Sequence, residues 1–152
     1  MDHHEYQAFD DFQNSLSPAE HRELVCTRRN TWSSSAHKVI VGEWSAAFTD
    51  CAYHLNGYKK GARYEGSFPD SKWHGSCENK RHIKDWSEEY RNEVRGYLET
   101  QLDTFEKHAE GWFFWNFKTE GGMGEWDALA LVDAGLFPQP LGDRKFERVC
   151  KV

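Results

Sequence analysis

A single carboxylate, Glu43, stands where a buried strand is expected to end. Residues 39–41 (VIV) form a short β-branched run typical of strands buried on both faces, and Gly42 lets the backbone turn there. A carboxylate beside an apolar strand and Trp44 loses hydration unless partners stabilise its charge. The placement therefore indicates either a catalytic acid or one half of a buried ion pair.

The first residues carry a second group of reactive side chains. If residues 2–9 begin as a strand, His4 and Tyr6 project from one face. His3 and Glu5 then project from the other. The alternative is a solvated, disordered terminus. The two histidines and the aspartate before them are also metal-ligand types, but no further ligand lies at a spacing that a metal site requires, so we expect no metal.

Five sequence blocks follow one another along the chain: DHHEYQAF, GEWSAAFTDCAYHLNG, KKGARYEG, GWFFWNFKTE and GLFPQPLGDR. These blocks resemble fungal exo-β-1,3-glucanases of glycoside hydrolase family five. The resemblance spans nearly the whole chain. It implies a retaining hydrolase that releases glucose from the ends of β-1,3-glucan without a cofactor. Glu43 would be its catalytic nucleophile, at the end of barrel strand seven.

The resemblance also implies roles for residues around Glu43. His4 and Tyr6 would lie at the end of strand six, with Tyr6 able to donate a hydrogen bond to the nucleophile. Phe9 would help to clamp a sugar at the mouth of the pocket. Trp115 would be the platform under the innermost sugar, and the alternative for it is a place in the barrel core.

Three positions bear on how the sugar is held. Asn56 matches a family residue that lines the sugar subsites. Lys60 stands where the family pattern usually has arginine, and lysine lacks the planar fork that can hold two hydroxyl groups at once. Phe68 stands where tyrosine is expected, which removes a hydroxyl partner. These departures predict a weaker or altered hold on the substrate.

A retaining glycosidase needs a second carboxyl group about 5 to 5.5 Å from the nucleophile, to protonate the leaving oxygen. In the resembling enzymes this acid follows an asparagine at the end of strand four, and no such pair precedes Glu43. The acid/base residue is therefore expected to be absent from this chain. Four other nearby carboxylates lie outside the acid motif and are expected to be solvated or structural: Asp50, Glu120, Glu125 and Asp127.

The four cysteines contain no Cys-x-x-Cys pair, which disfavours a zinc ribbon or a thioredoxin-like site. The resemblance implies disulfides between Cys51 and Cys77 and between Cys26 and Cys150. Such bonds need an oxidising compartment, and the resemblance implies an extracellular or cell-wall protein. The first residues, MDHHEYQ, lack the features of a signal peptide. A start codon read inside a longer secreted protein would reconcile the two observations.

Length and charge limit the possible architecture and partners. The chain has 152 residues, whereas a (β/α)8 barrel takes about 250. We therefore expect residues 1–152 to form a single partial glycoside hydrolase domain of the α/β class. It would be the C-terminal part of a TIM barrel, with about strands six to eight and their helices. Its open sheet edges predict dependence on a missing N-terminal barrel portion. A net charge of −6 argues against nucleic-acid partners, and no apolar run is long enough to span a bilayer.

Capping signals and periodicity predict the elements that position these side chains. A capping box at Ser17 begins a helix that should end near Cys26, before a polar surface loop at residues 28–35. Apolar residues at three- and four-residue steps predict a helix over 87–107, with Glu and Arg on its other face. The remaining predictions are a short helix at 49–56 closed by Gly57, a last parallel strand at 112–117 and a short helix within 126–136.

Two classes of function remain open at this point. The first is a retaining exo-β-1,3-glucanase, with doubtful activity for the isolated chain. The second is a truncated, non-catalytic remnant that binds carbohydrate weakly through Tyr6, Phe9 and Trp115.

Overall fold

A computed structural model describes residues 1–146 and 149–150. The fold is mixed α/β and contains one three-stranded sheet in the order β1-β2-β3, with both pairs parallel. The strands are β1 (Asp2–Glu5), β2 (Ile40–Trp44) and β3 (Trp112–Phe114). Such a sheet is compatible with part of a barrel. Because β1 is an ordered strand, the alternative of a disordered terminus does not hold.

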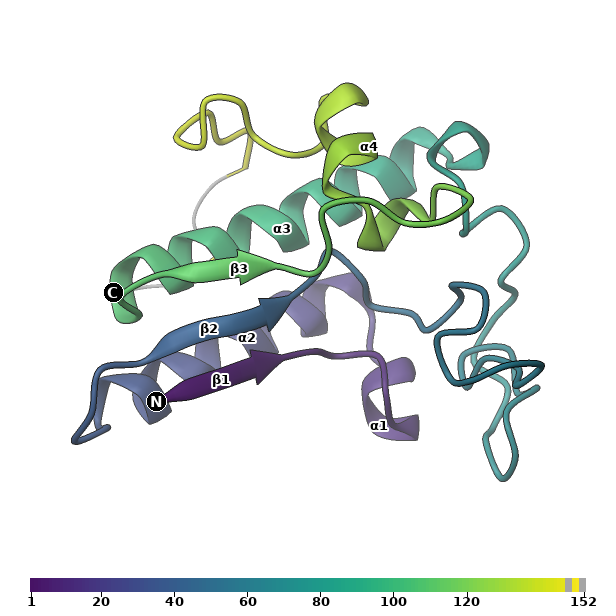
Figure 1. The fold of residues 1–152 in the computed structure, drawn as a ribbon, viewed down its shortest axis with the longest axis horizontal. Helices are drawn as coiled ribbons and strands as arrows, with labels where there is room; N and C mark the ends of the chain where they lie inside the picture. The colour runs from purple at the N-terminus through teal and green to yellow at the C-terminus, as the bar shows by residue number, and fades with distance from the viewer. Residues whose placement is uncertain (147–148, 151–152) are drawn as a thin grey trace.

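Helices connect the strands, as parallel pairing requires. Figure 1 shows both long helices behind the sheet, so only one face of the sheet is covered. The helices are α1 (Asp11–Asn14), α2 (Pro18–Ser33), α3 (Glu88–His108) and α4 (Ala128–Asp133), with two 3-10 turns, η1 (Ile83–Asp85) and η2 (Gly124–Trp126). No helix in the described part of the chain is long and apolar enough to cross a membrane.

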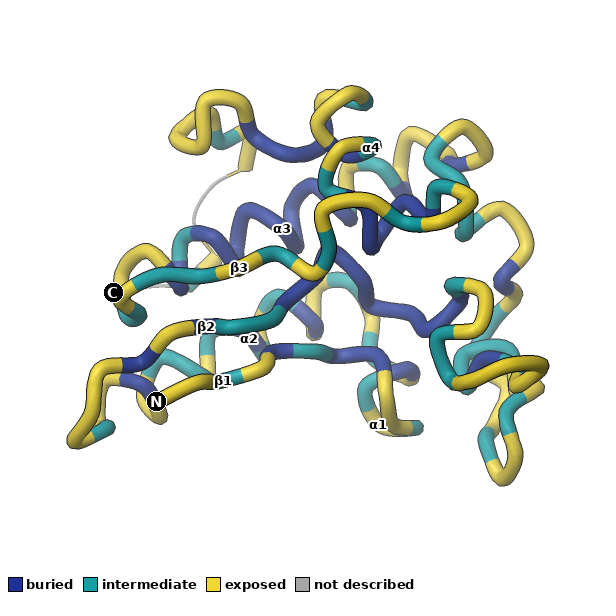
Figure 2. Tube along the Cα trace, in the orientation of Figure 1, coloured by how far each residue is buried: buried dark blue, intermediate teal, exposed yellow. Residues whose placement is uncertain are grey.

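The core lies between the sheet and α3. Trp44 of β2 is fully buried, and its ring packs 5.1 Å from Phe105 of α3 and 5.0 Å from Phe114 of β3, measured between ring centroids. Edge-on contacts of this kind are favourable for aromatic rings. Figure 2 shows the buried residues concentrated in α3 and in the end of β2. This packing fixes the end of β2, where Glu43 lies.

The start of α2 confirms the predicted capping box: Ser17 and Glu20 bond each other's backbone N–H groups. The predicted end near Cys26 is wrong, because the helix continues through the expected loop to Ser33. Two long-range contacts hold this extension. Arg28 lies 3.1 Å from the buried carboxylate of Glu5, and the ring of Trp32 packs in the core.

Helix α3 confirms the predicted helix and its apolar face, which is buried along its length. The expected charged outer face is only partly present, because Arg95 and Glu99 are both buried. They form an ion pair with each other. Glu99 also accepts hydrogen bonds from the backbone N–H groups of Lys145 and Phe146, and Arg95 donates to the carbonyl of Gly135. The pair therefore joins the C-terminal segment to α3.

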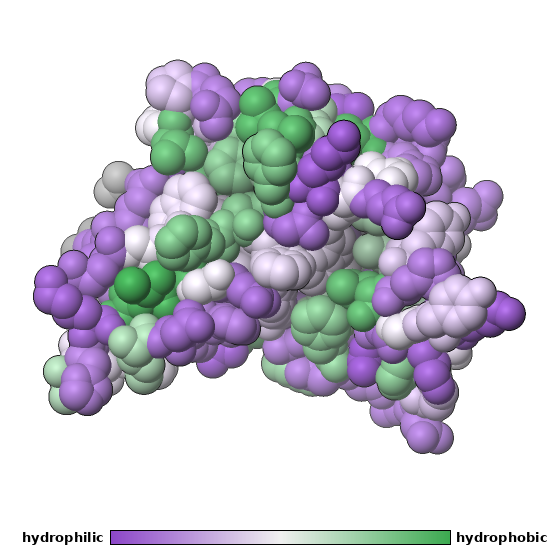
Figure 3. Space-filling view, in the orientation of Figure 1, coloured by the Kyte–Doolittle hydropathy of each residue, from purple (hydrophilic) through white to green (hydrophobic). Residues whose placement is uncertain are grey.

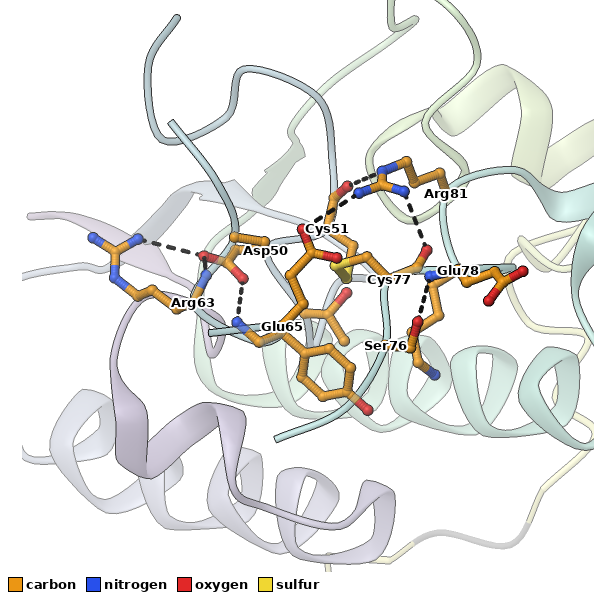
Figure 4. The surroundings of a disulfide bond; sticks show 12 residues. Asp50, Cys51, Arg63, Glu65, Ser76, Cys77, Glu78 and Arg81 are labelled. Carbon is orange, nitrogen blue, oxygen red and sulfur yellow. Dashed lines mark hydrogen bonds and ion pairs between the residues drawn. A yellow bond between two sulfur atoms is a disulfide. The ribbon is translucent and has the colours of Figure 1, made fainter. Parts of the chain in front are cut away.

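The predicted helix at 49–56 is wrong. Residues 45–82, all of them described, contain turns and one isolated bridge between Glu65 and Trp73 but no helix. His54 adopts a left-handed φ of 60°, which a continuing α-helix does not allow. The buried carboxylate of Asp50 instead accepts backbone N–H groups from Arg63 and Tyr64 and so folds the loop back on itself (Figure 4).

Two disulfides fasten the loops and the C-terminal segment. Cys51 pairs with Cys77 across the long loop, with Cα atoms 5.3 Å apart, and Arg81 donates hydrogen bonds to the carbonyls of both cysteines (Figure 4). Cys26 of α2 pairs with Cys150 near the other end of the chain. These are the two pairs that the family resemblance implies.

The strand around Glu43 is not buried on both faces. Val39 and Val41 are buried, but Ile40 is 43% exposed, because no helix covers its face of the sheet. Gly42 also has a different role from the predicted turn, since β2 continues to Trp44. A Cβ atom at Gly42 would lie 2.0 Å from Oδ1 of Asp2, so glycine allows β1 to approach.

The uncovered face carries large apolar side chains. Phe113, Trp115 and Phe117 alternate along the segment that includes β3, and all three are exposed. The predicted strand at 112–117 is correct in its parallel pairing but shorter, since β3 ends at Phe114. Figure 3 shows apolar surface on this side of the molecule. A sheet with unpaired edges and an exposed apolar face tends to associate with other chains.

Candidate active site

Glu43 lies near the carboxyl end of β2 with its side chain 29% exposed. The hydroxyl of Tyr6 donates a hydrogen bond to its Oε2 at 2.8 Å. Nδ1 of His4 lies 3.5 Å from the same oxygen. One carboxylate oxygen is therefore approached by two groups from the neighbouring strand and the residue just beyond it.

The pairing of β1 with β2 explains this arrangement. His4 is the register partner of Glu43, and Tyr6 follows two residues later on the same face. His3 and Glu5 project to the opposite face, where His3 Nε2 lies 2.8 Å from the Glu5 carboxylate. The predicted alternation is thus confirmed, and it separates two carboxylates that lie on neighbouring strands.

Tyr6 is set to act as a hydrogen-bond donor. Burial raises the pKa of its hydroxyl far above the ordinary value, and the hydrogen bond to Glu43 and the charge of that carboxylate raise it further. The phenol therefore stays protonated at neutral pH and keeps its proton directed to Oε2. A donor at one oxygen leaves the other oxygen available to attack an electrophile.

Aromatic rings form the wall beside this pair. Tyr6 packs against Phe9 at 5.5 Å and against Trp126 at 5.5 Å between ring centroids, and Phe9 lies 6.0 Å from Trp126. Phe9 is partly exposed, whereas Trp126 is buried. Sequence reasoning missed Trp126. The available signal was its position just after the glycine-rich stretch 118–124.

Trp115 follows the end of β3 and is 48% exposed in this structure. Its backbone N–H donates to the carbonyl of Trp44, the residue after Glu43. The indole lines a cleft of about 240 Å³ together with Tyr53 and Trp126. Trp115 therefore shares a wall residue, Trp126, with Tyr6.

Asn56 and Lys60 lie on the long loop, and Asn56 bonds other loop residues rather than Glu43. The Asn56 amide donates to Asp50 at 2.8 Å and to the carbonyl of Gly61, and its oxygen accepts from Arg63. Lys60 is exposed and lines a second cleft of about 290 Å³. Since Tyr53 lines both clefts, the two openings adjoin.

Arg63 is a second residue that sequence reasoning did not single out, although it lies in the KKGARYEG block. It bonds both Asp50 and Asn56, and its guanidinium lies 3.9 Å above the ring of Phe68. A cation over an aromatic face is favourable. Phe68, which replaces the expected tyrosine, thus supports the arginine that orders the loop.

Three of the four other carboxylates are occupied in structural contacts. Asp50 holds the long loop, and Asp127 caps α4 and accepts from Thr119. Glu125 is buried and accepts from the hydroxyls of Tyr90 and Thr49. Glu120 is exposed at the surface. The described residues also contain no group of three His, Cys, Asp or Glu side chains placed to hold a metal ion.

Comparison with known proteins supports the resemblance to fungal glucanases. No family model matches the chain. Among curated proteins, it is 44% identical over 150 residues to a glucan 1,3-beta-glucosidase of Yarrowia lipolytica and 45% identical over 150 residues to one of Candida oleophila. It is also 43% identical over 154 residues to glucan 1,3-beta-glucosidase I/II of Saccharomyces cerevisiae.

These matches cover 99% of this chain but only 34% to 35% of each relative. The chain therefore spans about a third of the length of the relatives that it matches. The similarity includes the segment from Tyr6 to Trp115 in which the candidate site lies. The chain is thus homologous, over nearly all of its residues, to one portion of the fungal glucan 1,3-β-glucosidases.

Proposed function

We propose that this chain is the nucleophile-bearing part of a retaining exo-β-1,3-glucanase that releases glucose from the ends of β-1,3-glucan. The observation that carries the proposal is the Tyr6–Glu43 hydrogen bond at the carboxyl end of neighbouring parallel strands. Active sites of (β/α)8 enzymes lie at that end of the sheet. The names of the fungal relatives support the same activity. We place its action outside the cell or in the cell wall.

In this proposal Glu43 attacks the anomeric carbon of the terminal glucose. The glycosidic bond breaks, and a glycosyl ester forms on the carboxylate. Water then releases glucose and regenerates Glu43. Tyr6 donates its hydrogen bond to Oε2 and orients the carboxylate, and His4 reaches the same oxygen.

The leaving oxygen needs a proton from a second carboxyl group. The relatives are nearly three times as long as this chain, so there is room for that group in the part of the barrel to which this chain does not correspond. We propose that the strands one to five of such a barrel supply it. They would pair with the open edges of the sheet and cover the exposed side chains of Ile40 and Phe113.

The aromatic side chains would hold the sugar. Trp115 would lie beneath the innermost glucose, and Phe9 would contact the next sugar at the mouth of the pocket. Lys60 would contact a sugar from the adjoining cleft, which it lines. Asn56 would line a subsite from the same loop, in which its amide donates to Asp50 and Gly61. Lys60 provides single hydrogen bonds where an arginine fork would provide two, so this contact is expected to be weaker.

The test separates attack by Glu43 from proton donation. A 2-deoxy-2-fluoro-β-glucosyl fluoride carries a leaving group that departs without a proton, so the nucleophile alone can form the glycosyl ester. Mass spectrometry of the intact chain should show one adduct. After digestion, the adduct should lie on the peptide that contains Glu43. Glu43→Gln should abolish it, and Glu120→Gln should leave it unchanged. An adduct that persists in Glu43→Gln would contradict the proposal.

The exposed rings of Trp115 and Phe9 favour one alternative, a non-catalytic module that binds β-1,3-glucan. Retention on insoluble β-1,3-glucan that requires Trp115, together with no fluoroglucosyl adduct, would support it. Retention in the Trp115→Ala variant equal to that of the unmodified chain would count against it. Both outcomes are distinct from hydrolysis of an aryl β-glucoside, which we expect to be absent for the isolated chain.

A further inference from the structure

Glu125 is a buried carboxylate that the proposed chemistry does not use. It is 3% exposed and lies in the η2 turn directly before Trp126. Its Oε2 accepts a hydrogen bond from Thr49 at 2.9 Å, and its Oε1 accepts one from the hydroxyl of Tyr90. Hydrogen bonds to an ionised acceptor are the stronger kind, and their loss inside a protein is costly.

These bonds connect three segments that are distant in sequence. Thr49 belongs to the loop that follows β2, and Tyr90 belongs to the first turn of α3. The backbone carbonyl of Glu125 accepts the N–H of Ala46, so the η2 turn is also tied to the end of β2 by its main chain. Main-chain bonds also hold the turn, because the N–H of Gly124 donates to the carbonyl of Arg81 and the N–H of Asn116 donates to the carbonyl of Trp126. The Glu125 carboxylate is the side chain that ties the turn to both the loop after β2 and α3.

From Trp126 the contacts continue directly to the nucleophile. The indole packs on the ring of Tyr6 at 5.5 Å, and the hydroxyl of Tyr6 donates to Glu43 at 2.8 Å. A displacement of the turn would move the surface against which Tyr6 packs. Trp126 also lines the cleft beside Trp115, so the same displacement would change the sugar platform.

The surroundings of Glu125 set its ionisation close to neutrality. Burial raises its pKa to about 7, although the hydroxyls of Tyr90 and Thr49 and the ammonium group of Lys80 favour the ionised form. Above that pH the carboxylate accepts both hydroxyl protons. Below it the carboxyl group carries its own proton, so one hydroxyl must turn its proton elsewhere.

The titratable and charged groups that face Glu125 come from the loop before α3, from α3 itself and from the long loop. They are Lys80, Arg81, Tyr90, Tyr97 and Tyr64. Burial raises the pKa values of all three tyrosines, so they stay protonated over the neutral range. Burial lowers the pKa of the Lys80 ammonium group from its ordinary value of 10.5. Glu125 is therefore the group expected to titrate here between pH 6 and 8.

We propose that Glu125 is a positioning residue: its carboxylate fixes the turn that carries Trp126, and Trp126 in turn fixes the ring of Tyr6 against Glu43. The inference deepens the proposed glucanase function and rests on it for its biological meaning. Its structural content concerns only side chains of this chain, so it can be tested without any sugar.

The experiment measures ring contacts in the full chain by nuclear magnetic resonance as the pH changes. The nuclear Overhauser effect between the Tyr6 and Trp126 rings should weaken as the pH falls. The midpoint of this change should equal the midpoint at which the chemical shift of the Glu125 carboxyl carbon titrates. In Glu125→Gln the same effect should be independent of pH. The ring pair of Trp44 and Phe105, in the core at 5.1 Å, serves as the internal control and should not respond.

Thr49→Val provides a second variant that retains the titrating group. It removes one donor to the ionised form, so the Glu125 midpoint should shift to higher pH. The transition in the Tyr6–Trp126 contact should shift by the same amount. This comparison decides the question even if Glu125→Gln does not fold.

Two results would overturn the inference. One is a Tyr6–Trp126 contact that stays constant while Glu125 titrates in the unmodified chain. The other is a transition that persists unchanged in Glu125→Gln. Failure of the fluoroglucosyl adduct to form would overturn the proposed nucleophile but would leave this ring titration as it is, so the two failures are distinguishable.

Discussion

At the scale of single residues, the hydrogen bond from Tyr6 to Glu43 is the contact on which the proposed chemistry depends most directly. Tyr6→Phe keeps the ring packing on Phe9 and Trp126 and removes only the hydroxyl donor. A hydrogen bond to a charged group contributes about 1.5 to 3 kcal/mol, and about 1.4 kcal/mol corresponds to a factor of ten in rate. We therefore expect labelling of Glu43 by the fluoroglucosyl fluoride to slow by about 10- to 100-fold.

The control is Tyr58→Phe, which removes a hydroxyl from a ring that is 76% exposed. Its labelling rate should equal that of the unmodified chain. An unchanged rate in Tyr6→Phe would show that the 2.8 Å contact does not assist attack by Glu43.

His21 gives a pH-dependent prediction for stability. The imidazole is 1% exposed, stacks on Phe48 and lies 2.8 Å from Oε1 of Gln7. Burial lowers its pKa to about 4. In the unfolded chain the His21 imidazole takes up a proton near pH 6.5, whereas in the folded chain it does so only near pH 4. The free energy of unfolding therefore decreases as the pH falls from 6.5 to 4. The loss should reach roughly 3 kcal/mol.

Urea unfolding at pH 4 and pH 7 measures this effect. His21→Gln should reduce the stability difference between the two pH values, because it removes the titrating group. His37→Gln, at an exposed position, should leave that difference unchanged. Equal differences in all three proteins would show that His21 does not contribute to the acid sensitivity.

Sequence reasoning went furthest where local geometry decides the outcome. Strand alternation alone placed His4 and Tyr6 on one face and His3 on the other. It could not find Trp126 or Arg63, because their roles arise from contacts with residues more than ten positions away or from an irregular loop. Neither kind of contact has a periodic signature.

At the scale of elements, the same distinction explains which boundaries were predicted. The beginning of α2 depends on Ser17 and Glu20, which are close in sequence. Its end depends on contacts of Arg28 and Trp32 with other elements, so the polar composition of residues 28–35 was misleading. The predicted helix at 49–56 was wrong for the same reason, because the contacts of Asp50 and the Cys51–Cys77 bond override the local helix propensity.

The two disulfides differ in the length of chain that they close, which predicts different contributions to stability. Cys26 and Cys150 are 124 positions apart, and Cys51 and Cys77 are 26 apart. In the chain-entropy model the first is worth about 4 to 5 kcal/mol and the second about 3 to 4 kcal/mol. Replacing the first pair by serine should therefore lower the free energy of unfolding more than replacing the second.

Urea denaturation of the two double variants checks this order, and each variant is the control for the other. The Cys26–Cys150 bond also fastens the C-terminal segment to α2. Its loss should let that segment move away from α3 and expose the side chains of Arg95 and Glu99 to solvent. A larger loss from the Cys51–Cys77 variant would mean that the long loop, rather than the closure of the chain, dominates the stability.

At the scale of the whole molecule, the sheet is covered on one face and open on the other. The helices α2 and α3 lie behind the strands, while apolar side chains remain on the front face and both edge strands lack a further neighbour among the described residues. The sequence predicted the open edges from the number of strands. Alternation along residues 112–117 puts Phe113, Trp115 and Phe117 on one face, and all three are exposed. The sequence could not predict that β3 ends at Phe114.

Neighbouring residues of β3 test the difference between the two faces. Phe113 is 67% exposed on the open face, whereas the ring of Phe114 packs 5.0 Å from Trp44 and 5.4 Å from Phe137. Phe113→Lys should leave the free energy of unfolding within about 0.5 kcal/mol, as expected for surface substitutions. It should also reduce self-association in sedimentation velocity, because a charge on an open sheet opposes pairing with another chain. Phe114→Lys should instead destabilise the fold by several kcal/mol, since it puts an unpaired charge into the core.

The two substitutions also separate the isolated chain from an assembled barrel. On the open face, a lysine at position 113 costs little until a barrel portion covers that face, and then it meets apolar side chains. Phe113→Lys should therefore lower the affinity for a co-expressed polypeptide that carries the preceding strands, measured by co-purification, while the chain alone remains folded. If the variant bound such a polypeptide as well as the unmodified chain does, the open face of this sheet would not be the surface that completes the barrel.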